Sequence, residues 1–109
     1  IDIEQLKTSG PALGLIQNAN FKENVVQINQ NSTLFLFTDG LSERMDSENN
    51  MFGEQRIIDI IKKSKREKVS QLIDEIKLDL TNFSKGVADN DDTTFMAVKF
   101  KTQNLEVRQ

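Results

Sequence analysis

Asp39 is the first residue whose type and position could carry chemistry. It follows the apolar run of residues 34–37 and precedes Gly40. A carboxylate at the end of a buried strand is held rigidly with its head toward a cleft, and glycine lets a ligand or metal approach the backbone. An Asp-Gly pair also forms ordinary turns between elements. For this position taken alone, the structural interpretation is favoured over the functional one.

Three further aspartates stand together directly before the last apolar segment of the chain: Asp89, Asp91 and Asp92. Like charges this close repel unless a positive charge lies between them, and a divalent cation can supply that charge. A solvated acidic loop is the alternative, because solvent and salt screen the repulsion at modest cost. For this cluster alone, the structural interpretation is again favoured.

Taken together, the two acidic positions favour a functional interpretation. Each lies beside a short apolar strand candidate, and if those strands are neighbours, Asp39 and the pair Asp91 and Asp92 converge at one edge of the sheet. The chain has no His and no Cys, and convergent carboxylates without these residues are typical of an Mg²⁺ or Mn²⁺ site. Such a site can hold two metals and activate a water against a phosphate ester. Glu43 could point to the same site or be an exposed loop residue, and both interpretations stay open.

Length and composition restrict the class of protein. The chain has 109 residues, no Cys and a formal net charge of −3, which predicts one small domain, or part of one, without disulfides. The mildly acidic balance argues against nucleic acid as a partner. No apolar run is long enough for direct insertion into a membrane, and the N-terminal residues do not resemble a signal peptide. We therefore expect one segment, 1–109, without a linker, in the cytoplasm, although a membrane-bound sensor could tether the parent protein.

Four segments are strand candidates. Residues 1–9 could form an edge strand, and residues 25–28 form a short candidate. Residues 34–37 are a continuous apolar run, as expected for a strand buried on both faces. The last candidate covers residues 94–100, and the polar residues 43–52 predict a loop.

Two helices are predicted before the last strand. Glu54–Lys63 has isoleucines at helical spacing and ends in two lysines, which suit the negative C-terminal end of a helix. The second helix begins with the capping-box pattern Ser64-x-x-Glu67 and stops at Gly86. Its apolar residues form one broad stripe: Val69, Leu72, Ile73, Ile76, Leu80 and Phe83. This order predicts an α+β fold in which an antiparallel helix pair covers one face of a sheet.

Four short motifs occur in an order that resembles one protein family. They are Gly10-Pro-Ala-Leu-Gly-Leu15, Leu34-Phe-Leu-Phe-Thr-Asp-Gly-Leu-Ser-Glu43, Met51-Phe-Gly-Glu-Gln-Arg56 and Asp91-Asp-Thr-Thr94. From about residue 3 to residue 100, the chain resembles the C-terminal half of the bacterial metal-dependent, type 2C-like serine/threonine phosphatases. Within these, it is similar to the branch of the sporulation stage II protein E and sigma-factor-regulator phosphatases.

This resemblance implies part of a β-sandwich flanked by helix pairs, with two Mn²⁺ or Mg²⁺ ions at one end. By the family's motifs, Asp39 and Asp91 would bind metal, Asp92 would take the neighbouring position, and Glu43 would bind a metal or its water more loosely. The implied activity is hydrolysis of phosphoserine or phosphothreonine on a small regulatory protein of the anti-sigma-factor-antagonist type. Members often follow a sensor domain and often pair as dimers, so a homodimer is an expected assembly.

One departure from the family pattern shapes these expectations. The family has an upstream Asp-x-x-Gly-His-Gly segment whose Asp bridges the metals, and this chain has no His. We therefore expect an excised C-terminal part of the domain that is inactive alone and that self-associates through exposed sheet surface. The alternatives are a non-catalytic interaction or sensor-coupled module of the same fold, and a simple divalent-ion-binding domain.

Overall fold

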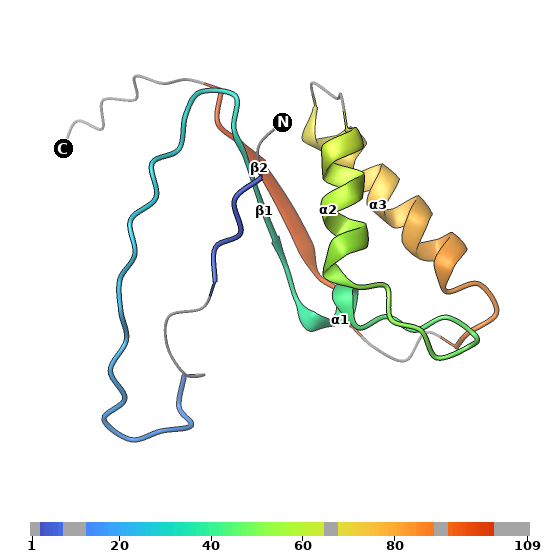
Figure 1. The fold of residues 1–109 in the computed structure, drawn as a ribbon, viewed down its shortest axis with the longest axis horizontal. Helices are drawn as coiled ribbons and strands as arrows, with labels where there is room; N and C mark the ends of the chain where they lie inside the picture. The colour runs from blue at the N-terminus through green and yellow to red at the C-terminus, as the bar shows by residue number, and fades with distance from the viewer. Residues whose placement is uncertain (1–2, 8–12, 65–67, 89–91, 102–109) are drawn as a thin grey trace.

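The chain folds as a short sheet with a pair of helices packed beside it (Figure 1). The structure, a computed structural model, describes residues 3–7, 13–64, 68–88 and 92–101. The elements in chain order are β1 (Thr33–Phe37), α1 (Asp39–Ser42), α2 (Glu54–Lys63), α3 (Val69–Phe83) and β2 (Phe95–Lys99). The predicted α+β class is confirmed, and the described residues contain a single two-stranded sheet, as expected of an incomplete domain.

The strands β1 and β2 form a two-stranded antiparallel ladder. Its register places Leu36 opposite Met96 and Phe37 opposite Phe95. Because the strands are antiparallel, the end of β1 lies beside the start of β2. The prediction that these two strands are neighbours is therefore confirmed.

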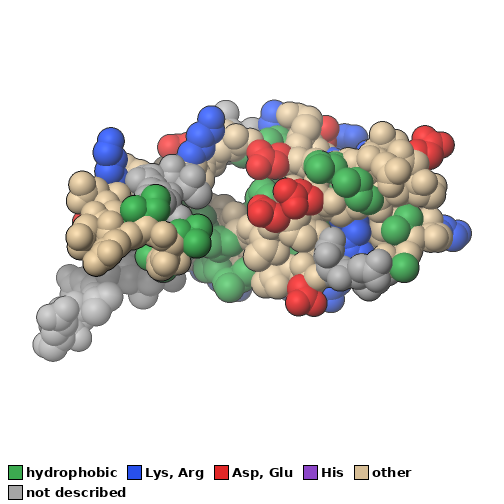
Figure 2. All heavy atoms as spheres, turned by 90° about the horizontal axis from the view of Figure 1, so that it is seen from below, with side chains coloured by type: hydrophobic (Ala, Val, Ile, Leu, Met, Phe, Trp, Pro, Cys, Tyr) green, Lys and Arg blue, Asp and Glu red, His purple; other side chains and the backbone are tan. Residues whose placement is uncertain are grey.

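The two faces of the ladder differ in what covers them. Phe35, Phe95 and Ala97 lie on one face and pack against the buried core. On the opposite face, Leu36 and Met96 keep 47% and 56% of their surface exposed, as expected from the alternation of side chains along a strand. The predicted burial of this apolar run on both faces is therefore wrong, because the described residues cover only one face. Figure 2 shows open hydrophobic side chains between the extended N-terminal part and the helical part.

The core lies where the helix pair meets the sheet and the loop that follows α1. Helices α2 and α3 run antiparallel beside each other (Figure 1), and α3 also packs against β2. The fully buried cluster consists of Leu41, Phe52, Ile57, Leu72, Ile76 and Leu80. Three of these residues follow one another at every fourth position of α3, as the predicted apolar stripe requires. Burial of one such side chain stabilises the fold by about 1.5–3 kcal/mol.

The helix boundaries confirm one prediction and correct another. Helix α2 has the predicted bounds, and Gly86, with a φ of +85°, lies just beyond the end of α3. Helix α3 begins only at Val69, with Lys68 at its N-cap and no side-chain cap hydrogen bond. Ser64 instead ends α2, so the predicted capping box is wrong, since the chain must reverse direction before an antiparallel helix can begin. Glu67 lies outside the described residues.

Two predicted strands are absent from the described part of the chain. Residues 3–7 and residues 25–28 have no strand assignment, and Val25 is 96% exposed. A short apolar segment becomes a strand only when a partner supplies its hydrogen bonds, and no such partner lies beside these residues in the described structure. The other residues of the predicted segment 1–9 lie outside the described ranges. None of the described helices has the length and the apolar character needed to cross a membrane.

Candidate functional site

Hydrogen bonds join the end of β1 to the start of β2 beyond the last paired residues of the ladder. The Thr38 N–H donates to the Thr94 carbonyl at 3.0 Å. The Thr38 hydroxyl donates to the same carbonyl and accepts from the Thr94 N–H, both at 3.3 Å. These bonds connect residues 56 positions apart and hold the Thr-Asp-Gly motif beside the segment that leads into β2.

Gly40 lies against the backbone of Asp92. A Cβ built at position 40 would overlap the Asp92 carbonyl oxygen, and the other nearest atoms also belong to the backbone of residues 92 and 93. Backbone atoms cannot rotate away as the end of a flexible side chain can. The two motifs therefore touch at a point where only glycine fits.

The three predicted site residues that the structure describes belong to the segments that meet here. Asp39 is the first residue of the four-residue helix α1, and Glu43 is its C-cap. Asp92 lies beside Gly40 through its backbone. The side chains of all three acidic residues are exposed, so they are open to solvent instead of being buried in the core. Asp91 lies outside the described residues.

Thr93 and Arg44 form a second link between the two motifs. The Thr93 hydroxyl donates to the Gly40 carbonyl at 3.2 Å, and Arg44 Nη2 donates to the Thr93 Oγ1 at 2.5 Å. Both side chains are half-buried. Neither residue is predicted from the sequence, because the only signal for Thr93 is its place next to the predicted ligand Asp92, and no signal pairs it with Arg44.

The loop after α1 fixes the backbone of Arg44. The Phe52 N–H donates to the Arg44 carbonyl at 2.7 Å, and the Gly53 N–H donates to the Ser42 carbonyl at 2.8 Å. The Phe52 side chain is only 3% exposed and belongs to the core. Phe52 thereby anchors the loop in the core beside the backbone of Arg44.

Asp46 organises the tip of the same loop. Its Oδ1 accepts from the backbone N–H groups of Asn50 at 2.8 Å and Glu48 at 2.9 Å, and its Oδ2 accepts from the Asn50 side-chain amide at 3.1 Å. The backbone hydrogen bond from Asn50 is the main reason why the pKa of Asp46 lies below its ordinary value of 3.8. The Asn50 amide, the Glu48 N–H and the charge of Arg56 act in the same direction, against partial desolvation. These bonds give this carboxylate a structural role in the loop.

The donor atoms at the motif junction agree in type with a hard divalent cation but do not complete a site. In the residues that the structure describes, no three Asp, Glu, His or Cys side chains gather as a metal would require. The carboxylates of Asp39, Glu43 and Asp92 are oxygen donors of the kind that Mg²⁺ and Mn²⁺ prefer. These residues therefore fit such an ion only as contributors to a larger set of ligands.

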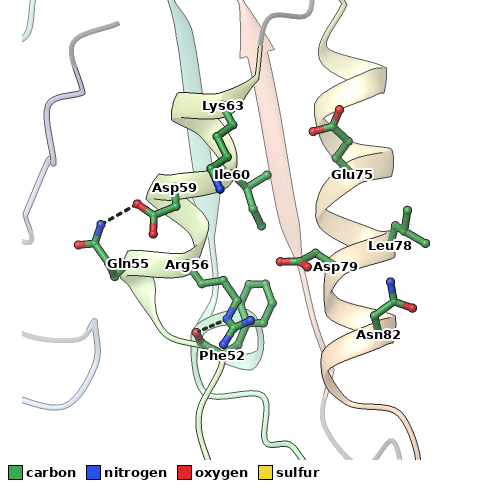
Figure 3. A pocket seen from close by; sticks show the side chains of 10 residues that line it. All are labelled: Phe52, Gln55, Arg56, Asp59, Ile60, Lys63, Glu75, Leu78, Asp79 and Asn82. Carbon is green, nitrogen blue, oxygen red and sulfur yellow. Dashed lines mark hydrogen bonds between the residues drawn. The ribbon is translucent and has the colours of Figure 1, made fainter.

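A groove between α2 and α3 is a separate feature of the surface (Figure 3). Its lining residues are Phe52, Gln55, Arg56, Asp59, Ile60, Lys63, Glu75, Leu78, Asp79 and Asn82. The Arg56 guanidinium lies 5.4 Å from the ring centre of Phe52 and 4.5 Å from that of Phe83. Such cation–π contacts stabilise the packing of a helix pair. The groove contains none of the predicted site residues, so we assign the chemistry to the motif junction.

Comparisons with known proteins give independent information about the chain. The family model described as stage II sporulation protein E matches residues 2–101. Protein IcfG of Synechocystis sp. is 30% identical over 94 residues, which are 86% of this chain and 15% of that protein. The chain thus spans only a small part of the length of this curated relative. No solved structure matches the chain at a comparable level of significance.

Proposed function

The chain belongs to the stage II sporulation protein E family of type 2C-like phosphatases, and on that basis we propose that it forms part of a metal-dependent protein serine/threonine phosphatase. Hydrolase chemistry on phosphate esters follows from the family. We further propose the identity of the metal, of its ligands and of the phosphoprotein substrate. The complete protein, and not this segment alone, is the proposed active species.

The observation that carries the proposal is the contact between Gly40 and the Asp92 backbone. This contact joins the motif that contains Asp39 to the motif that contains Asp91, although the two are far apart in the sequence. Two acidic segments that meet at the ends of neighbouring strands are the arrangement that a carboxylate-bound divalent ion needs. The contact supports the proposal because it places the two acidic segments side by side.

The chain contributes ligands and a rigid support in this proposal. We assign metal binding to Asp39 and Asp91, a looser contact to a metal or its water to Glu43, and the neighbouring position to Asp92. When bound, Mn²⁺ or Mg²⁺ supplies electrostatic stabilisation of the charge that develops on the phosphate oxygens. Helix α1 holds Asp39 at the end of β1, and the chain has no His or Cys that could act as a covalent nucleophile.

The partner in this proposal is a small phosphorylated regulatory protein of the anti-sigma-factor-antagonist type. The exposed acidic residues at the strand ends support it, because a bulky protein substrate can reach carboxylates that are open to solvent. A homodimer, a cytoplasmic location and a role in sigma-factor regulation or signal transduction belong to the same proposal. Each of these points needs the complete protein for its test.

The proposal is tested by the hydrolysis of a small aryl phosphate by the complete protein with added Mn²⁺ and, separately, with a chelator. Asp39→Asn and Asp91→Asn should each lower kcat by about 100-fold or more, since each removes a charged group that acts in the transition state. Glu43→Gln should have a smaller effect. Asp59→Asn, an exposed carboxylate on α2, is the matched control and should keep the wild-type rate. Near-normal rates in both the Asp39 and Asp91 variants would contradict the assignment.

A second candidate is a non-catalytic interaction or sensor-coupled module of the same fold, and a third is a simple ion-binding domain without hydrolysis. The groove between α2 and α3, which contains none of the predicted site residues, favours the interaction module as a surface for a partner. Hydrolysis and calorimetry together separate the candidates. A complete protein that binds Mn²⁺ but hydrolyses no phosphate ester would support the ion-binding domain, and one that does neither would support the interaction module.

A further inference from the structure

Arg44, Thr93 and Gly40 form a continuous chain of hydrogen bonds across the motif junction. Arg44 Nη2 donates to the Thr93 hydroxyl, and that hydroxyl donates to the Gly40 carbonyl. A hydroxyl has one proton to donate and two lone pairs that accept, so a single threonine can serve both bonds. Because the donor to Thr93 is a guanidinium, the bond is charge-assisted and strengthens the next bond in the chain.

The Gly40 carbonyl needs this partner because of where it lies. Helix α1 has only four residues, and the last carbonyls of a helix have no partner within the helix. The Thr93 hydroxyl supplies the missing donor to the Gly40 carbonyl. The bond therefore fixes Thr93 to a backbone atom of the turn that begins with Asp39.

Arg44 is itself held in place from the core side. Its carbonyl accepts from the N–H of the buried Phe52, and its N–H donates to the Leu41 carbonyl at 3.3 Å. The Leu41 side chain is 0% exposed. The guanidinium thus extends from a backbone that is pinned between two core residues, so it can act as a fixed support for Thr93.

We propose that Arg44 is a positioning residue that acts through Thr93 to hold the acidic segment at the start of β2 against the turn that carries Asp39. Thr93 directly follows Asp92, so a loss of its two bonds would loosen the backbone that sets where this acidic segment lies, although the bonds between Thr38 and Thr94 remain. The inference rests on the proposed function, because it assigns to these bonds the spacing of the proposed metal ligands.

The test compares Mn²⁺ binding and phosphatase activity in variants of the complete protein. Free Mn²⁺ is followed by electron paramagnetic resonance, which reports binding without turnover. Thr93→Val keeps the shape of the side chain and removes both hydrogen bonds, and Thr93→Ser keeps the hydroxyl. Arg44→Met removes the guanidinium and keeps the length of the side chain. Lys77→Met is the matched control, since it removes an exposed cation on α3.

We expect Thr93→Val and Arg44→Met each to weaken Mn²⁺ binding by about 10-fold, the loss typical of residues that orient a metal ligand. The double variant should be no weaker than the worse single variant, because both changes break one linked unit. Thr93→Ser should bind within about twofold of wild type. Lys77→Met should leave both Tm and Mn²⁺ binding unchanged.

Unchanged Mn²⁺ affinity in both Thr93→Val and Arg44→Met would overturn the inference, and so would losses that multiply in the double variant. If Arg44→Met does not fold, the comparison of Thr93→Val with Thr93→Ser decides the matter alone. Asp39→Asn separates this failure from that of the proposed function. If Asp39→Asn weakens binding and the two positioning variants do not, only the positioning role is wrong; if Asp39→Asn binds Mn²⁺ and turns over normally, the proposed function is wrong.

Discussion

The backbone carbonyl of Asp92 occupies the space that a side chain at Gly40 would need. The contact joins two segments that each carry predicted metal-binding carboxylates. A displacement of one segment must therefore displace the other, so the site is sensitive to changes that remove no charged group.

Gly40→Ala is expected to reduce activity more than its effect on stability would explain. The new methyl group must push the backbone of residues 92 and 93 away, at a cost of about 1–3 kcal/mol for overpacking. The measurements are Tm and Mn²⁺-dependent hydrolysis by the complete protein. Gly86→Ala is the control, because a Cβ there meets nothing within 4 Å but its φ is +85°. It should lower Tm and keep the wild-type rate, and equal activity in the two variants would contradict the steric argument.

Asp46→Ala is expected to destabilise the protein in a pH-dependent way. The folded state lowers the pKa of Asp46, so the folded state favours the carboxylate form. The resulting stability is fully present above the ordinary value of 3.8 and is lost as the pH falls through the lower pKa of the folded state. The Tm difference between wild type and variant should therefore be largest near neutral pH and shrink below pH 3.8. A difference that stays constant down to acid pH would show that the hydrogen bonds of this carboxylate do not stabilise the loop.

Ile76→Ala and Leu78→Ala test the burial of α3 at two positions, two residues apart, on one helix. Ile76 is 0% exposed and Leu78 is 63% exposed. The first change should cost about 2–5 kcal/mol, because it removes buried methyl groups and leaves a cavity. The second should cost no more than about 0.5 kcal/mol. Urea unfolding measures the free energy of unfolding of both variants. A larger loss of stability for Leu78→Ala would show that the face of α3 with Ile76 is not the buried one.

Leu36→Lys and Met96→Lys test the open face of the ladder. The side chains lie opposite each other in the register and are both about half exposed. An exposed apolar sheet face favours association, so the isolated 109-residue chain should self-associate, and the double substitution should shift it toward monomer. Analytical ultracentrifugation measures this shift. The same mass distribution for both proteins would mean that this face does not drive association.

Elements with a strong local pattern could be predicted from the sequence. Helix α2 combines isoleucines at helical spacing with two terminal lysines, and its predicted bounds are the observed ones. The apolar runs of β1 and β2 likewise predict strands at these positions. Ser64 shows the limit of local signals, because a capping pattern cannot by itself say whether the chain is free to start a helix at that point. Residues 25–28 are a second example, since a strand forms only beside a partner strand, which local sequence cannot predict.

For the candidate site too, some features could be predicted from local sequence and others could not. The position of Asp39 at the end of a strand, and its proximity to the segment before β2, could be predicted from strand order and the motifs. The link from Arg44 to Thr93 could not, because its hydrogen bond depends on a loop that is fixed by Phe52 in the core. The metal-binding roles of Asp39, Asp91, Glu43 and Asp92 stay predictions.

The pairing of Thr38 with Thr94 spans 56 positions of the chain, and both helices of the hairpin lie between them. During synthesis on the ribosome, Asp39 leaves the exit tunnel long before the strand that completes its surroundings has been made. The helix hairpin has only short-range contacts to form and can fold first, whereas contacts between distant residues form slowly. A polypeptide stalled before residue 94 would thus carry the Asp39 turn without the Thr94 backbone that holds it in place.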